Sequence, residues 1–285
     1  MGYHWIKAEE FSMEAVLLFD RWVIRYIMSE NTWYNNGQRD YKTDMAKALS
    51  RYPYVIEFCK RKAPECAGFL KEIEDINAAG FLKEIRGIHA ARISEAEARR
   101  AETEILSAWE HFVVYAYPEV MEQLGYIRNW RPERLYALAE FKGKLVLDIG
   151  SGTGRLAFAA AARAERVYAS EPCDVLREYM RDKIRQNGIT NMKVLDGEIT
   201  NLPYEDNTFD VVMAGHVAGA LYEEGIAEMT RVVKDGGVLI CCNGDDEVKR
   251  KVPEEALVRR GFEYFVHESC DGGVIYDYRK VVHKS

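Results

Sequence analysis

The stretch Val146-Leu147-Asp148-Ile149-Gly150-Ser151-Gly152-Thr153-Gly154-Arg155 decides the fold of this chain. Its first four residues are mostly apolar and typical of a buried strand, and a helical pattern follows the glycines. Glycine permits a tight turn and lets a ligand touch the backbone directly. We therefore predict a strand, a glycine loop that receives a ligand, and a helix.

The region after Gly143 alternates short β-branched runs with helical stretches, which favours βαβ units and a mainly parallel sheet. The predicted strands are Leu145–Ile149, Val167–Ser170, Met192–Leu195, Asp210–Ala214, Gly237–Cys242, Glu263–His267 and Val274–Val282. The turn Asp271-Gly272-Gly273 joins the last two strands as a hairpin. The sequence thus predicts an α/β, Rossmann-like, doubly wound, seven-stranded sheet with a C-terminal antiparallel hairpin, preceded by an α-helical N-terminal domain.

Glu171 follows the second predicted strand, at about the offset where an acidic side chain reaches a ribose diol. A carboxylate can accept hydrogen bonds from two vicinal hydroxyls. However, Gly152-x-Gly154-x-x-Ala157 also satisfies the dinucleotide-binding fingerprint. These features alone do not distinguish a dinucleotide from another nucleoside cofactor.

Three later segments narrow the choice: Gly197-Glu198-Ile199-Thr200-Asn201-Leu202-Pro203-Tyr204, Asp206–Val212 and Arg231–Leu239. Together with the glycine loop, they closely resemble the class I S-adenosylmethionine (SAM) dependent methyltransferases of the methyltransferase type 11 family. The resemblance covers about Leu145 to Gly244 and, more loosely, the final hairpin. It implies a methyltransferase that uses S-adenosyl-L-methionine as cofactor and a small molecule as acceptor.

The resemblance also implies roles for individual residues. The glycine loop would hold the methionine end of SAM, Glu171 the ribose, and Glu198 the adenine amino group, with Ile199 against the ring. Glu198 stands where the family usually has Asp, and the extra methylene shifts that contact; a helix cap or a surface carboxylate is the alternative. The implied cofactor-binding residues are Asp148, Gly150, Ser151, Gly152, Gly154, Glu171, Pro172, Gly197, Glu198, Ile199 and His216.

Asp148 gives a physical argument against a dinucleotide. A carboxylate just before the glycine loop would repel a pyrophosphate, whereas it attracts the sulfonium and ammonium groups of SAM. A structural role for Asp148, holding amides of the loop, is compatible with this one.

Catalysis of methyl transfer requires no signature base, because alignment of the nucleophile, methyl and sulfur supplies much of the acceleration. His216, after the fourth predicted strand, is the candidate catalytic residue and would deprotonate an acceptor hydroxyl or amine. The alternative is a histidine that only lines the pocket. No Asn/Asp-Pro-Pro-Tyr/Phe motif follows that strand, which disfavours the exocyclic-amine nucleic-acid and glutamine methylases.

The helical pattern in front of the sheet suggests two domains, residues 1–125 and 126–285. The second domain has short loops, so we expect the helical domain to form a lid that recognises the acceptor. Candidate residues for an apolar acceptor pocket are Trp33, Tyr34, Phe112, Tyr115 and Tyr117. The competing interpretation is that this domain mediates partner binding or a homodimer.

The formal charge of −7 argues against a protein that binds nucleic acid over its whole surface, because binding to phosphates needs clustered Lys and Arg side chains. The basic run Arg86–Arg100 alternates with glutamates, as on a solvated helix face. The six cysteines form no Cys-x-x-Cys pair, so we expect reduced thiols, no metal and a cytoplasmic location. The chain shows no signal peptide and no apolar stretch of membrane-spanning length, so no membrane partner is expected.

Two other functions remain open at this stage. One is transfer of an aminocarboxypropyl group from SAM, which would use the same site with the acceptor facing another carbon. The other is a non-catalytic binding or scaffold protein that keeps the fold of a SAM-dependent methyltransferase.

Overall fold

The computed structural model describes residues 7–28, 40–85, 93–109, 112–215, 217, 222–242, 252–269 and 272–284. The chain divides into two compact units, Met1–Tyr117 and Pro118–Ser285. The boundary thus precedes the predicted one, because helix α7 (Pro118–Gln123) packs on helix α11 (Asp174–Gln186). Glu122 of α7 accepts a hydrogen bond from Tyr179 at 2.5 Å and pairs with Lys183, which ties α7 to the second unit.

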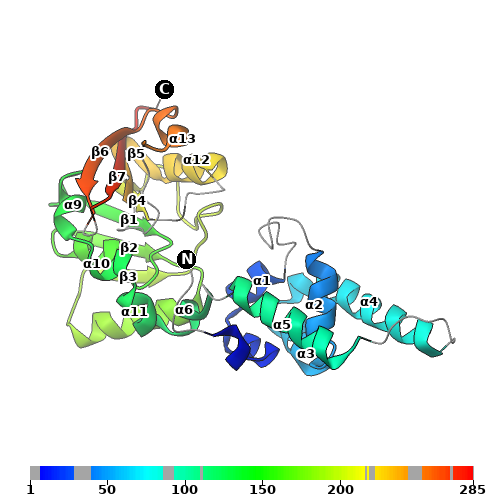
Figure 1. The fold of residues 1–285 in the computed structure, drawn as a ribbon. Coiled ribbons are helices and arrows are strands. Elements are labelled where there is room, and N and C mark those ends of the chain that lie inside the picture. Colours follow the sequence, from blue (N-terminus) through cyan, green and yellow to red (C-terminus); the bar gives the residue numbers. More distant parts are fainter. Residues whose placement is uncertain are drawn as a thin grey trace. The chain divides into compact units, whose positions relative to one another are not determined.

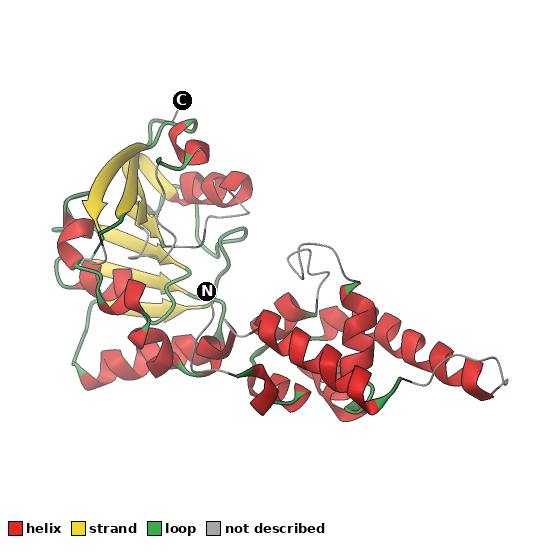
Figure 2. Ribbon diagram, in the orientation of Figure 1, coloured by secondary structure: helices red, strands yellow, loops and turns green. Residues whose placement is uncertain are grey.

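The described residues of the first unit form helices joined by loops, with no strand among them (Figure 2). Its α-helices are α1 (Arg21–Ile27), α2 (Tyr41–Leu49), α3 (Pro53–Lys62), α4 (Ala67–Ile85), α5 (Glu95–Trp109) and α6 (Val113–Ala116). Short 3-10 helices span Ala8–Glu10, Met13–Leu18 and Pro64–Cys66. In the described part of the chain, every helix is too short or too polar to cross a lipid bilayer.

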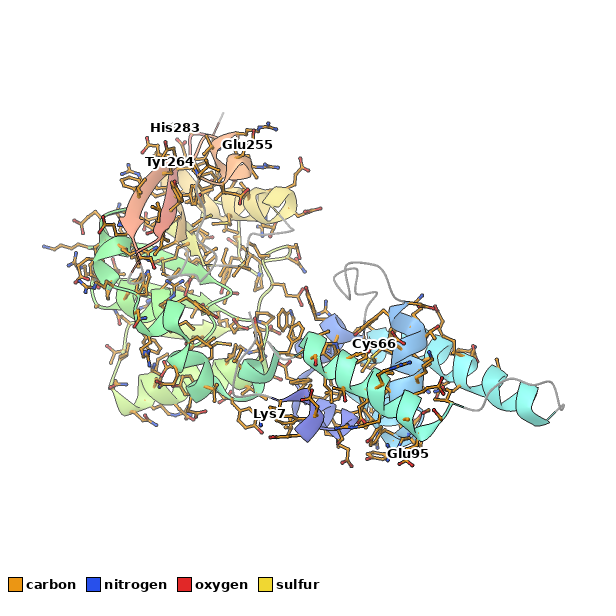
Figure 3. All side chains as sticks on the ribbon, viewed as in Figure 1. Lys7, Cys66, Glu95, Glu255, Tyr264 and His283 are labelled. Carbon is orange, nitrogen blue, oxygen red and sulfur yellow. The ribbon has the colours of Figure 1, made fainter. Side chains whose placement is uncertain are left out.

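A buried hydrogen-bond relay fixes the core of the first unit. Trp109 of α5 donates from Nε1 to the hydroxyl of Tyr41 at 3.1 Å, and that hydroxyl donates to the carbonyl of Ile27 at 2.5 Å. The relay joins three helices through groups that apolar side chains surround. Cys59 and Cys66 are buried free thiols in the same core, and Figure 3 labels Cys66 among these helices.

The second unit contains the predicted seven-stranded sheet (Figure 1). Its strands are β1 (Leu145–Ile149), β2 (Arg166–Ser170), β3 (Met192–Leu195), β4 (Phe209–Ala214), β5 (Val233–Cys242), β6 (Glu263–Glu268) and β7 (Val274–Val281). The order is β3-β2-β1-β4-β5-β7-β6, with β7 antiparallel to β5 and β6 and every other pair parallel. The α/β fold with its C-terminal hairpin is therefore confirmed.

Helices cover both faces of this sheet, because successive residues of a buried strand point to opposite sides. Val146 faces a core shared with α9 (Pro132–Tyr136), α10 (Arg155–Ala161) and α11, whereas Leu147 faces α12 (Tyr222–Val232) and α13 (Glu255–Val258). The remaining short helix is α8 (Gly125–Arg128). The adjacent Cys241 and Cys242 are buried in these two opposite cores, so they do not converge on one site.

A buried ion pair anchors α9 to strand β7. Arg134 donates two hydrogen bonds to the carboxylate of Asp277, at 2.9 and 2.7 Å, and the Asp277 side chain has no exposed surface. Burial raises the pKa of Asp277, but His267, with Nε2 3.2 Å from the carboxylate, and the hydrogen bonds from Arg134 outweigh it and hold that pKa below its usual value. The carboxylate therefore stays charged inside the protein.

We expect Asp277→Asn to destabilise the protein by about 3–5 kcal/mol, because it leaves Arg134 buried without a counter-charge. Urea unfolding measures the change. Asp182→Asn is the matched control, since Asp182 pairs with Arg185 on an exposed face of α11 and its loss should cost less than about 1 kcal/mol. Equal unfolding midpoints for the Asp277 variant and the wild type would contradict the prediction.

Candidate functional site

The glycine loop lies at the carboxyl end of β1, next to the end of β2. The amides of Gly150 and Ser151 both donate to the carbonyl of Ser170, at 2.8 and 3.2 Å, and the amide of Gly154 donates to Ser151 at 2.8 Å. Gly150, Gly152 and Gly154 have φ angles of 61°, 57° and 93°, which L-residues rarely adopt. The loop turns through backbone conformations that require these glycines.

The three glycines differ in what surrounds them. A Cβ on Gly150 would lie 2.3 Å from Val217, and one on Gly154 would lie 2.5 Å from Phe158, so both positions exclude a side chain. At Gly152 the nearest atom would be the sulfur of Met121 at 3.7 Å, an ordinary contact. Of the three, Gly152 has room beside its backbone.

Glu171 connects the glycine loop to the end of β2, and its predicted role on a ribose stays a prediction. Its Oε2 accepts from the amide of Gly152 and its Oε1 from the amide of Cys173, both at 2.9 Å. The side chain is only 3% exposed, and Arg177 donates to its backbone carbonyl at 2.5 Å. The carboxylate is therefore held in one orientation beside the loop; Pro172, which follows it, is half-buried.

Asp148 is almost completely buried behind the same loop. Burial raises its pKa from 3.8 to about 7, opposed by a hydrogen bond from Ser151, the positive charge of Arg155 and the amide of Ala157. The predicted role of holding amides of the loop stays a prediction for Asp148. Its Oδ2 has no hydrogen-bond partner in the described part of the chain, so that one oxygen remains free for a ligand.

The segment after β3 approaches the end of β2. A Cβ on Gly197 would lie 2.2 Å from the hydroxyl of Ser170, so this close approach requires glycine. Glu198 is half-buried and bridges to Asn201. The Ile199 side chain is buried and touches Gly225 of α12, where a Cβ would lie 2.9 Å from it. The structure thus brings this segment to the end of β2, and the adenine contacts stay predictions.

The remaining predicted residues either lie outside the described part of the chain or belong to the first unit. His216 lies outside the described residues, as do Trp33 and Tyr34. In the first unit, Phe112 and Tyr115 join Trp22 and Tyr26 in an aromatic cluster with ring centroids 5.1 to 6.1 Å apart. Tyr117 is 45% exposed. Of the basic run, Arg99 binds the carbonyls of Glu9 and Phe11, which makes it structural.

Sequence reasoning missed Met121, Trp130 and the role of Arg155. Arg155 ends the decisive motif, yet only the structure shows its guanidinium 4.8 Å from the centre of the Trp130 ring. The position of Arg155 directly after the last glycine was the one available signal. Among the described residues no group of three or more His, Cys, Asp or Glu side chains is arranged to hold a metal ion.

Asp148 should make stability depend on pH, because its carboxyl ionises more easily in the unfolded chain than in the folded one. Relative to Asp148→Asn, the wild-type free energy of unfolding should fall as pH rises from about 4 to about 7, by at most about 1.4 kcal/mol per pH unit, and stay level above that range. Urea unfolding of both proteins across this range measures the difference. Parallel curves would show that Asp148 ionises normally.

Known proteins resemble the second unit. Residues 147–241 match the family model described as a methyltransferase domain. The chain is 27% identical over 154 residues to a demethylmenaquinone methyltransferase of Clavibacter sepedonicus, covering 53% of this chain and 60% of that protein. It is 33% identical over 124 residues to the protein of the same name from Thermobifida fusca (strain YX), covering 42% and 51%. The chain thus spans about half the length of the curated relatives it matches.

Solved structures also align with this chain. A SAM dependent methyltransferase from Aquifex aeolicus aligns with a TM-score of 0.49 and 22% identity, over 59% of this chain and 98% of that one. A Haemonchus contortus phosphoethanolamine N-methyltransferase 1, in complex with phosphoethanolamine and S-adenosylhomocysteine, aligns with a TM-score of 0.47 and 15% identity, over 67% and 50%. By the family match, the C-terminal half of this chain carries a methyltransferase domain.

Proposed function

We propose that this protein transfers a methyl group from SAM to a small-molecule acceptor. The observation that supports this most directly is the pairing of Glu171 with the amide of Gly152 at the edge where β1 and β2 end. In open α/β sheets, ligands bind at this carboxyl edge. A carboxylate held in one orientation suits the hydroxyls of a ribose, and an accessible glycine backbone beside it leaves room for the small cationic group that SAM carries next to its ribose.

The chain's residues fit SAM in three ways. Glu171 accepts one amide on each oxygen, which fixes the orientation of its carboxylate, and a carboxylate in that orientation suits the two hydroxyls of a ribose diol. Gly152 leaves the backbone accessible. The unpartnered Oδ2 of Asp148 can accept from an ammonium group. When bound, SAM would supply a methyl group that its sulfonium already activates.

The acceptor side is less defined. We propose that the helical unit selects the acceptor as a lid and that His216 takes a proton from it. The names of the curated relatives refer to demethylmenaquinone. Because this chain spans about half of those proteins, a naphthoquinol is the first acceptor to test and not an assigned substrate. A cytoplasmic location, supported by the five buried free thiols in the described part, belongs to the same proposal, as does a homodimer.

The test is incubation of the purified protein with SAM and a panel of small acceptors that includes a naphthoquinol, followed by mass spectrometry. We expect S-adenosylhomocysteine to accumulate together with an acceptor heavier by one methyl group. Methylthioadenosine as the product would establish aminocarboxypropyl transfer instead. Absence of SAM binding in calorimetry would contradict both activities.

Glu171→Ala should weaken S-adenosylhomocysteine binding by roughly 10- to 100-fold, because it removes charge-assisted hydrogen bonds to the ribose. Glu178→Ala is the matched control, since Glu178 is exposed on α11 and pairs with Arg181. A 2′,3′-dideoxy analogue separates a ribose contact from loop damage. Removing the diol should weaken binding to the wild type but not further weaken binding to the Glu171 variant. Additive losses would contradict the ribose role.

A further inference from the structure

Seven polar side-chain atoms of the second unit are buried without a hydrogen-bond partner in the described part of the chain. Three of the seven are Oδ2 of Asp148, Nη1 of Arg155 and Nε1 of Trp130. The Arg155 guanidinium lies over the Trp130 ring, 4.8 Å from its centre. Asp148 and Arg155 attract each other electrostatically. The three atoms therefore belong to one neighbourhood and are not scattered gaps in the core.

This neighbourhood lies where β1, β4 and β5 end. Arg155 donates from Nη2 to the carbonyl of Cys242, the last residue of β5, at 3.1 Å. Gly215 directly follows β4, and a Cβ there would lie 2.8 Å from the same Nη2. Asp148 is in β1, just before the glycine loop. The guanidinium thus lies at the carboxyl edge of the sheet. Glu171 follows β2, on one side of β1 in the sheet, whereas Arg155 contacts the end of β5, on the other side.

Among the described residues, no carboxylate is hydrogen-bonded to the guanidinium of Arg155. Arg134, on the neighbouring α9, makes two hydrogen bonds to Asp277. Within the described residues, Arg155 donates to the backbone carbonyl of Cys242 and to no carboxylate, while the charges of Asp148 and Asp277 act on it only through space. A buried charged donor without an acceptor is costly, so proteins normally pair such groups.

We propose that Arg155 and Trp130 form a binding site for a carboxylate group of a ligand. Both free atoms are donors and can serve only an acceptor, and guanidinium matches carboxylate geometry. The free oxygen of Asp148 is complementary, since it accepts from an ammonium. A carboxylate and an ammonium on one carbon make an α-amino acid, so the amino-acid end of the methyl donor is the favoured source. To that extent the inference rests on the proposed function; a carboxylate on the acceptor is the other source.

Calorimetry with two nucleosides tests the donor as the source. S-adenosylhomocysteine carries the amino-acid group, and 5′-methylthioadenosine lacks it. We expect Arg155→Gln to weaken S-adenosylhomocysteine binding at least tenfold and to leave methylthioadenosine binding unchanged. Arg155→Lys keeps the charge and should lose less. Trp130→Phe keeps the ring but not the N–H, and should give a loss of about threefold with the same selectivity.

The second nucleoside is also the control for folding, because general damage to the site would weaken both. Arg163→Gln is the matched variant. Arg163 is exposed just after α10 and stacks on Tyr136, 3.5 Å from the ring centre, so its loss should change neither affinity.

A second measurement tests the acceptor as the source. In protein labelled with ¹⁵N-arginine, the Arg155 guanidinium signal is assigned by its loss in Arg155→Lys. Acetate and neutral acetamide are then added at constant ionic strength, with and without S-adenosylhomocysteine. A shift with acetate alone that persists beside the bound nucleoside places the carboxylate on the acceptor.

Selective loss of S-adenosylhomocysteine binding supports the site with the donor as its source, and an acetate-specific shift without that loss supports it with the acceptor. Equal weakening of both nucleosides, or weakening of neither, combined with no acetate-specific shift overturns the carboxylate site. If the wild type binds neither nucleoside, the methyl-transfer proposal fails instead, and the acetate titration of the free protein still decides whether Arg155 takes a carboxylate.

Discussion

The hydrogen bond from the amide of Gly152 to the carboxylate of Glu171 is the interaction on which the site depends. It joins the loop after β1 to the end of β2, and the second oxygen of Glu171 holds the amide of Cys173. Both oxygens are thus oriented before any ligand arrives. A ligand that binds there loses less free energy to the ordering of the protein, which is the general benefit of a preorganised site.

Sequence reasoning predicted most of the sheet because its strands are short apolar runs bounded by glycines and polar turns. The differences occur where local chemistry is ambiguous. Strand β5 begins at Val233, earlier than predicted, since Lys234-Asp235-Gly236-Gly237 has turn composition. The strand continues through it with Gly236 at a φ of 72° and a register shift opposite β4. Helix α9 ends at Tyr136, although the next glycine is Gly143 and no proline intervenes, so the sequence carries no stop signal at its end.

The site was predicted in part, for a related reason. The loop glycines and Glu171 follow a local motif, so sequence spacing was sufficient to bring them together. Burial is not local: the low exposure that raises the pKa of Asp148 to about 7 comes from packing of the whole unit. Helix α9 and strand β1 lie between Trp130 and Arg155 along the chain, and no pattern in the sequence indicates their contact. The position of His216, outside the described residues, stays a prediction.

The contact between Gly150 and Val217 has a consequence for protein engineering. Val217 follows β4 and fills the space that a side chain on Gly150 would need. The segment after β4 and the loop after β1 therefore share one steric fit and are not interchangeable modules. A designer who transplants the segment after β4 from another enzyme, in order to change which compound is modified, must carry over a side chain of matching shape at 217, or the graft will distort the glycine loop that it was meant to leave intact.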